Sequence, residues 1–232
     1  MFERHEDYLE PELITSMQKH SVRTFAWMTI GLLITAVTAV VVYQSELMYV
    51  IYSNRFMPLI ILVAQLGVVV ALAARIMKMS PTTAKLTFVG YSVLTGITFS
   101  TLAVAYPLGT IGVAFGISAV YFGSLVVIGY TTKMNLLRFG PILYGGLLAF
   151  IIVEVVMYFL GMDIMTMVMS GIGLALFTGI TAYDTQKMKA LYAQYAHDET
   201  MLEKLSIYSA LDLYLDFINI FLYILRFVSN KD

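Results

Sequence analysis

The chain has 232 residues, of which 59% are hydrophobic and only 12% are charged, and its net charge at pH 7 is −1. Soluble domains carry about 25% charged residues, so this composition excludes an ordinary soluble protein and indicates one with several membrane-spanning helices. The balanced charge predicts no nucleic-acid partner, and the lack of cysteine excludes disulfides, thiolate metal sites and cysteine nucleophiles.

Seven apolar runs follow one another along the chain, and each is close to the roughly 20 residues that a helix needs to cross a bilayer. They cover residues 24–43, 57–77, 84–107, 111–131, 141–160, 165–183 and 205–227. The prediction is an all-α integral membrane protein, a bundle of seven transmembrane helices with the seventh helix central. Residues 1–23 form an N-terminal segment, residues 24–228 the membrane domain and residues 229–232 a tail.

Lys and Arg residues are distributed unevenly between the connections. They concentrate in the N-terminal segment and in the second, fourth and sixth connections, whereas the other connections and the C-terminus hold only Arg55, Arg226 and Lys231. Basic residues accumulate on the cytoplasmic side of membrane proteins. We therefore expect a cytoplasmic N-terminus. Whether the last run passes fully through the membrane or is re-entrant stays open.

The last run, residues 205–227, has the length of a span but carries a polar stripe. On a helix at about 100° per residue, its polar side chains fall within an arc of roughly 80°. They are Tyr208, Asp212, Asp216, Asn219, Tyr223 and Arg226. A carboxylate near the bilayer centre costs at least about 2.5–3.5 kcal/mol, so two of them need partners, water or an ion. We predict that this helix lies inside the bundle.

Ionisable residues within spans are candidate functional residues. Asp184 lies in TAYDTQ at the cytoplasmic end of the sixth run. If the sixth and seventh helices are antiparallel neighbours, Asp184 approaches Asp212 or Asp216, and depth alone slightly favours Asp212. Glu154 lies in the fifth run, towards the outside.

Two carboxylates in a poorly solvated site repel one another, so the pair either shares a proton or binds a hard cation. Calcium suits such oxygen ligands, and it would compete with protons for them. This physics predicts a pH-sensitive cation site. A hydrogen-bonded pair that only locks two helices together is the structural alternative.

Two segments carry a resemblance to a known family. TAYDTQKMK at 181–189 and LYLDFINIFLYILR at 213–226 closely resemble the paired signature of the Bax inhibitor-1, or transmembrane Bax inhibitor motif, family. WMTIGLLITA at 27–36, YSVLTGITFS at 91–100 and GYTTKMNLLRFG at 129–140 are similar to its bacterial branch. The resemblance covers essentially the whole chain, and the two aspartate motifs are its specific part.

The resemblance implies a calcium leak channel whose opening responds to pH, in a bacterial inner membrane. By motif match, Asp184 and Asp216 would form the pH sensor and bind calcium. Calcium would be a permeant ion rather than a cofactor, and the expected partners are the lipid bilayer, calcium ions and protons.

Three further residues are accessory candidates. Some family members place a basic residue at the end of the second span, where it pairs with the first aspartate, and Arg75 is the nearest candidate here. Asp212 either joins the site or lies in a hydrated vestibule. Glu154 either attracts cations at an outer mouth or snorkels to the interface.

The alternative function is a non-transporting regulator that binds a membrane protease or a stress-response protein. Its expected contact surfaces are the N-terminal segment and the polar connection 185–204. Two aspartates on adjacent spans would also suit an intramembrane aspartyl protease. However, YLDF has no glycine beside its aspartate, so we expect no enzymatic activity.

Overall fold

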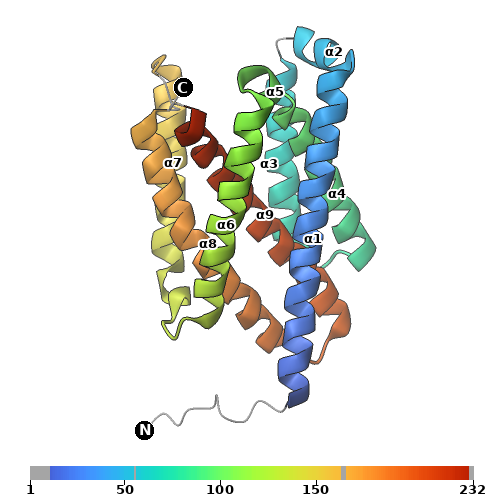
Figure 1. Ribbon diagram of the computed structural model, residues 1–232. Helices are drawn as coiled ribbons and strands as arrows, with labels where there is room; N and C mark the ends of the chain where they lie inside the picture. The colour runs from blue at the N-terminus through green and yellow to red at the C-terminus, as the bar shows by residue number, and fades with distance from the viewer. Residues whose placement is uncertain (1–10, 55, 163–165, 230–232) are drawn as a thin grey trace.

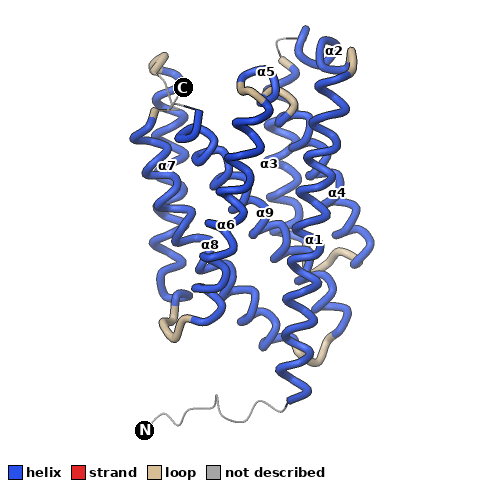
Figure 2. Tube along the Cα trace, in the orientation of Figure 1, coloured by secondary structure: helices blue, strands red, loops and turns tan. Residues whose placement is uncertain are grey.

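The computed structural model describes residues 11–54, 56–162 and 166–229, and every regular element among them is a helix. The elements are α1 (Pro11–Gln44), α2 (Leu47–Ser53), α3 (Met57–Arg75), α4 (Pro81–Phe99), α5 (Leu102–Ala105), α6 (Leu108–Thr131), the 3₁₀ helix η1 (Leu136–Phe139), α7 (Gly140–Phe159), α8 (Met167–Tyr195) and α9 (Glu199–Ser229). The long helices form one elongated bundle (Figure 1). Short loops join them (Figure 2).

Five of the described helical segments are long and apolar enough to cross a membrane. They are Ser16–Gln44, Pro81–Ala105, Leu108–Thr131, Leu136–Met157 and Met167–Tyr195. The apolar helix Ile60–Arg75 is shorter than these five, and α9 is not among them. The all-helical class is therefore confirmed, while the count of seven spans stays a prediction for α3 and α9.

Helix ends differ from the apolar runs at several places. The first helix begins at Pro11, well before the apolar run, so the described part of the N-terminal segment is continuous with the first span; residues 1–10 lie outside the described residues. Helix α8, which contains the sixth apolar run, continues past that run to Tyr195. The third run is divided into α4 and α5, and Tyr106 and Pro107 join α5 to α6.

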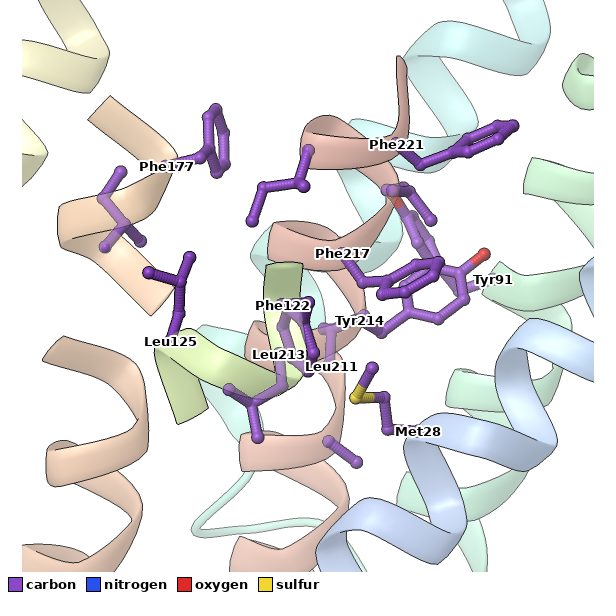
Figure 3. Packing of buried hydrophobic residues seen from close by; sticks show 14 of the residues in the cluster. Met28, Tyr91, Phe122, Leu125, Phe177, Leu211, Leu213, Tyr214, Phe217 and Phe221 are labelled. Atoms are coloured by element: carbon purple, nitrogen blue, oxygen red, sulfur yellow. The ribbon is translucent and has the colours of Figure 1, made fainter. Parts of the chain in front are cut away.

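Helix α9 is the most extensively packed element of the described chain. It contacts α1, α4, α6 and α8. Consecutive residues such as Asp216, Phe217 and Ile218 are all buried. Because neighbouring residues on a helix point about 100° apart, these positions cover most of the helix circumference. Side chains from several helices gather around α9 in Figure 3.

Tyr214 of α9 ties three helices together. It is fully buried, and its ring packs edge-on against Phe88 and Tyr91 of α4. The Thr35 hydroxyl of α1 donates to the carbonyl oxygen of Ser92 at 3.0 Å, so the Tyr214 hydroxyl, 2.6 Å away, donates to Thr35. A buried hydroxyl without a partner costs about 1–3 kcal/mol, so this chain of hydrogen bonds helps fix α9 against α1.

Two glycines allow the close approach of α8 to its neighbours. A Cβ on Gly129 of α6 would lie 2.5 Å from the carbonyl oxygen of Ala182, and one on Gly173 would overlap the ring of Tyr223. Gly112 and Gly116, spaced four residues apart on α6, do not take this role, because no heavy atom lies within 4 Å of a Cβ built at either position. Spacing alone does not show which glycines face a neighbouring helix.

The substitution Gly129→Ala is expected to destabilise the bundle by about 1–3 kcal/mol, the usual cost of overpacking. The added methyl group meets backbone at Ala182, which cannot move aside as a flexible side chain could. Thermal unfolding of the purified protein, followed by light scattering or by tyrosine fluorescence, measures the change. Gly112→Ala on the same helix is the matched control and should leave the midpoint unchanged. Equal midpoints for both variants would contradict the close α6–α8 contact.

Candidate functional site

A cavity of about 310 Å³ lies beside α9, and α3, α4, α7 and α8 form its other walls. Four of the five predicted site residues line it: Asp184, Asp212, Asp216 and Glu154. Asn219 and Tyr223 of the predicted polar stripe line it as well. The helical periodicity therefore located one side of this cavity correctly. The remaining polar side chains on its walls are Gln65, Tyr91 and Tyr144.

Asp184 is held on α8 with only 4% of its surface exposed. The hydroxyl of Tyr144, which comes from α7, donates to its Oδ1 at 3.0 Å. The Tyr144 ring also packs edge-on against Tyr183, the residue before Asp184. Tyr183 in turn fits against Gly140, the first residue of α7, where a Cβ would lie 2.8 Å from the tyrosine oxygen. These contacts fix α7 to α8 and direct the carboxyl group of Asp184 into the cavity.

Asp216 is the most buried carboxyl group of the cavity lining, with 2% exposure. Its Oδ2 atom has no hydrogen-bond partner among the described residues. The charged groups that act on it are Asp184, Asp212 and Lys187. Asp184 and Asp216 line the same cavity, and no hydrogen bond joins their carboxyl groups in the described chain. An unpartnered buried carboxylate oxygen is costly and is available to a proton or a cation.

Asp212 forms the shortest ion pair of the cavity lining. Lys187 Nζ lies 2.8 Å from its Oδ2 and 3.7 Å from Asp184 Oδ1. The same ammonium donates to the Tyr208 hydroxyl at 3.2 Å and stands 4.8 Å from the Tyr208 ring centre. One ammonium group is thus placed between two of the three aspartates, and Asp212 takes part in the site directly.

Lys187 is the main site residue that sequence reasoning did not identify. It follows Asp184 by three residues on a helix, a spacing that puts two side chains on the same face. It was assigned instead to the basic residues that indicate the cytoplasmic side. Combining the i,i+3 spacing with the position of Asp184 would have identified it.

Arg75 does not occupy the place expected for it. It is exposed at the last residue of α3 and takes part in none of the ion pairs among the described residues. The basic group beside Asp184 is Lys187, on the same helix. The reason is geometric: Arg75 belongs to a helix that packs on α4 rather than on α8.

Glu154 of α7 is half-buried and lines the same cavity as the aspartates. Its charge acts on the hydroxyl of Tyr223, which also lines the cavity. Asn219 donates to the carbonyl oxygen of Leu215 within its own helix, not to a neighbouring helix. The cavity therefore extends along α9 from Asp212 to Tyr223, with carboxyl groups at both ends.

The donor set of the cavity is made of oxygen atoms. Carboxylate and hydroxyl oxygens suit calcium, which prefers such ligands. Within the described residues no cluster of three or more His, Asp or Glu side chains is close enough to enclose a metal ion.

Comparison with known proteins identifies relatives of this chain. The family described as "Inhibitor of apoptosis-promoting Bax1" matches residues 17–232. The inner membrane protein YbhL of Escherichia coli is 36% identical over 232 residues, which cover 99% of this chain and 98% of YbhL. Proteins of Borreliella burgdorferi and Deinococcus radiodurans are each 35% identical over 223 residues, covering 96% of this chain and at least 95% of their own. The chain therefore belongs to the Bax inhibitor-1 family.

Proposed function

We propose that this protein is a pH-sensitive calcium leak channel of a bacterial inner membrane, gated by Asp184 and Asp216. The Escherichia coli relative is named an inner membrane protein, which supports the proposed location. The distribution of Lys and Arg supports a cytoplasmic N-terminus. In this proposal α1, α3, α4 with α5, α6, α7, α8 and α9 are the seven spans, and α9 is the central one.

The continuity of α9 supports a full passage through the membrane. The helix is unbroken over 31 residues, about 46 Å at roughly 1.5 Å per residue, and a hydrocarbon core is about 30 Å thick. It runs from the end of the bundle where α1 begins to the opposite end (Figure 1). Its polar face is turned to the cavity and its apolar faces to α1, α4 and α6.

The observation that carries the proposal is the imbalance of charge in the cavity. Three aspartates line the cavity, and Lys187, which lies beside it, is the one ammonium group paired with any of them in the described chain; one oxygen of Asp216 is buried without a hydrogen-bond partner there. Such a group of carboxylates lowers its energy by binding a proton or a divalent cation. Because both bind the same oxygens, protons compete with calcium, and the flux responds to pH.

A different cavity favours the alternative function of a non-transporting regulator. About 470 Å³ in volume, it lies between the first turns of the described α1 and the α8–α9 connection. His20, Arg23 and Glu199 are among its polar lining residues. These are the two segments expected to contact a membrane protease or a stress-response protein, so the cavity offers such a partner a polar docking surface. We propose no catalytic role for the aspartates in either case.

The test is calcium uptake into liposomes that contain the purified protein, followed with a trapped calcium dye from about pH 5 to about pH 8. We expect a flux that changes with pH and that Asp184→Asn makes insensitive to pH. Empty liposomes and liposomes with the heat-unfolded protein are the controls. Wild-type protein that passes no calcium at any pH would exclude the channel and leave the regulator.

A further inference from the structure

The ammonium group of Lys187 is paired with Asp212 and Asp184, two carboxylates of the cavity lining that could otherwise bind a cation. We propose that Lys187 is a tethered counter-cation, which a divalent ion must displace from Asp212 and Asp184 before it can pass. The inference rests on the proposed channel function and deepens it, because it assigns to this lysine the control of cation access and affinity.

The contacts of the ammonium group support this role. Its donors are directed at Asp212 Oδ2, at 2.8 Å, and at the Tyr208 hydroxyl, at 3.2 Å, with Asp184 Oδ1 3.7 Å away. A lysine ammonium donates and cannot accept hydrogen bonds. It therefore fills the same carboxylate oxygens that calcium requires, and the two cations exclude each other from them.

Lys187 lies beside the end of the cavity that Asp184 and Asp212 line. It lies one turn beyond Asp184 on α8, and its partner Asp212 lies one turn before Asp216 on α9. About 20% of its side chain is exposed, whereas Asp216 is buried. The ammonium thus neutralises the outer two carboxylates and leaves the deeper one without a cation. A lysine is suited to this, since its flexible stem lets the charge move away without unfolding the helix.

The alternative reading is a structural ion pair that only fixes α8 to α9. These two helices are already in extensive contact, including the close contact of Gly173 with Tyr223, so they do not depend on the ion pair to pack together. The two readings differ in one measurable respect. A structural Lys187–Asp212 pair stays intact when calcium is added, whereas a displaceable pair breaks when calcium binds to the carboxylate.

The first experiment uses the wild-type protein and therefore does not depend on the folding of a variant. The purified protein is treated briefly with an amine-acetylating reagent, with and without calcium, and the modified lysines are quantified by mass spectrometry. Calcium is expected to raise the modification of Lys187 severalfold. Lys189 is an internal control, because its ammonium donates to the Tyr130 carbonyl, away from the cavity. Equal modification of Lys187 at all calcium concentrations would overturn the inference.

The second experiment measures calcium binding and flux in Lys187→Met, Lys187→Arg and the control Lys189→Met. Lys187→Met should lower the half-saturating calcium concentration about tenfold or more, a change equivalent to at least about 1.4 kcal/mol. Lys187→Arg, which keeps the charge, and Lys189→Met should resemble the wild type. If the wild type passes calcium and Lys187→Met has the same half-saturation, the counter-cation role is wrong and the channel stands. If neither passes nor binds calcium, the proposed function fails, and the inference fails with it.

Discussion

Asp216→Asn is expected to abolish the pH-dependent calcium flux and, at the same time, to stabilise the fold. The carboxyl group is buried, has one oxygen without a hydrogen-bond partner and lies within reach of two other aspartates. An amide of the same shape removes one negative charge. At an effective dielectric constant of 20, a unit charge 4 Å away contributes about 4 kcal/mol, so calcium binding should weaken by well over tenfold. Removing the repulsion should stabilise the protein by about 1–3 kcal/mol.

The two effects are measured on the same preparation, by calcium uptake into liposomes and by thermal unfolding. Ser209→Ala is the matched control. Ser209 is also buried on α9, and its hydroxyl oxygen also lacks a hydrogen-bond partner among the described residues, but it does not line the cavity. That substitution should leave calcium uptake unchanged. If the Asp216→Asn protein shows the same pH-dependent calcium uptake as the wild type, Asp216 is not part of the gate. A less stable one would show that its carboxylate has a partner in the folded state.

The polar stripe of the last helix could be read from the sequence because it depends only on helical periodicity. Asp212, Asp216 and Asn219 fall on one side of any α-helix, and the cost of burying carboxylates in lipid requires that side to face the protein. In the structure the stripe lines the cavity, where Asp216 is buried while Asp212 and Asn219 are half-buried. The position of Asp184 in the same cavity follows in the same way, because α8 and α9 are consecutive and antiparallel.

Helical periodicity does not predict which basic residue lies beside Asp184. Arg75 was favoured by a family resemblance and by its place at the end of a span, but neither fixes the direction in which a helix end faces. The structure leaves Arg75 exposed and places Lys187 in the site. The close contact at Gly129 is equally hard to predict from the sequence, since it depends on the rotation of each helix about its axis. Long-range packing, rather than local pattern, decides both.

Narrowing the polar cavity should reduce the calcium flux, whereas filling the apolar cavity on the other side of α9 should not. Leu147 of α7 lines the polar cavity, and Leu147→Trp places a bulky indole where an ion would have to pass. Conduction through a pore depends on its free diameter and on the groups that line it. In a space of about 310 Å³, we therefore expect the flux to fall by about tenfold or more while Asp184 and Asp216 remain intact.

Ala39→Phe is the matched control, because Ala39 lines a cavity of about 260 Å³ formed mainly by apolar residues of α1, α5, α6 and α9. Both substitutions add an aromatic ring beside α9, so both carry an overpacking cost of up to about 1–3 kcal/mol. Equal thermal midpoints would show that any difference in flux arises from the position of the ring. If Leu147→Trp conducts as the wild type does, calcium does not pass beside the aspartates. If Ala39→Phe is the variant that blocks, the path lies on the apolar side of α9, and the carboxylates act on it only through movement of that helix.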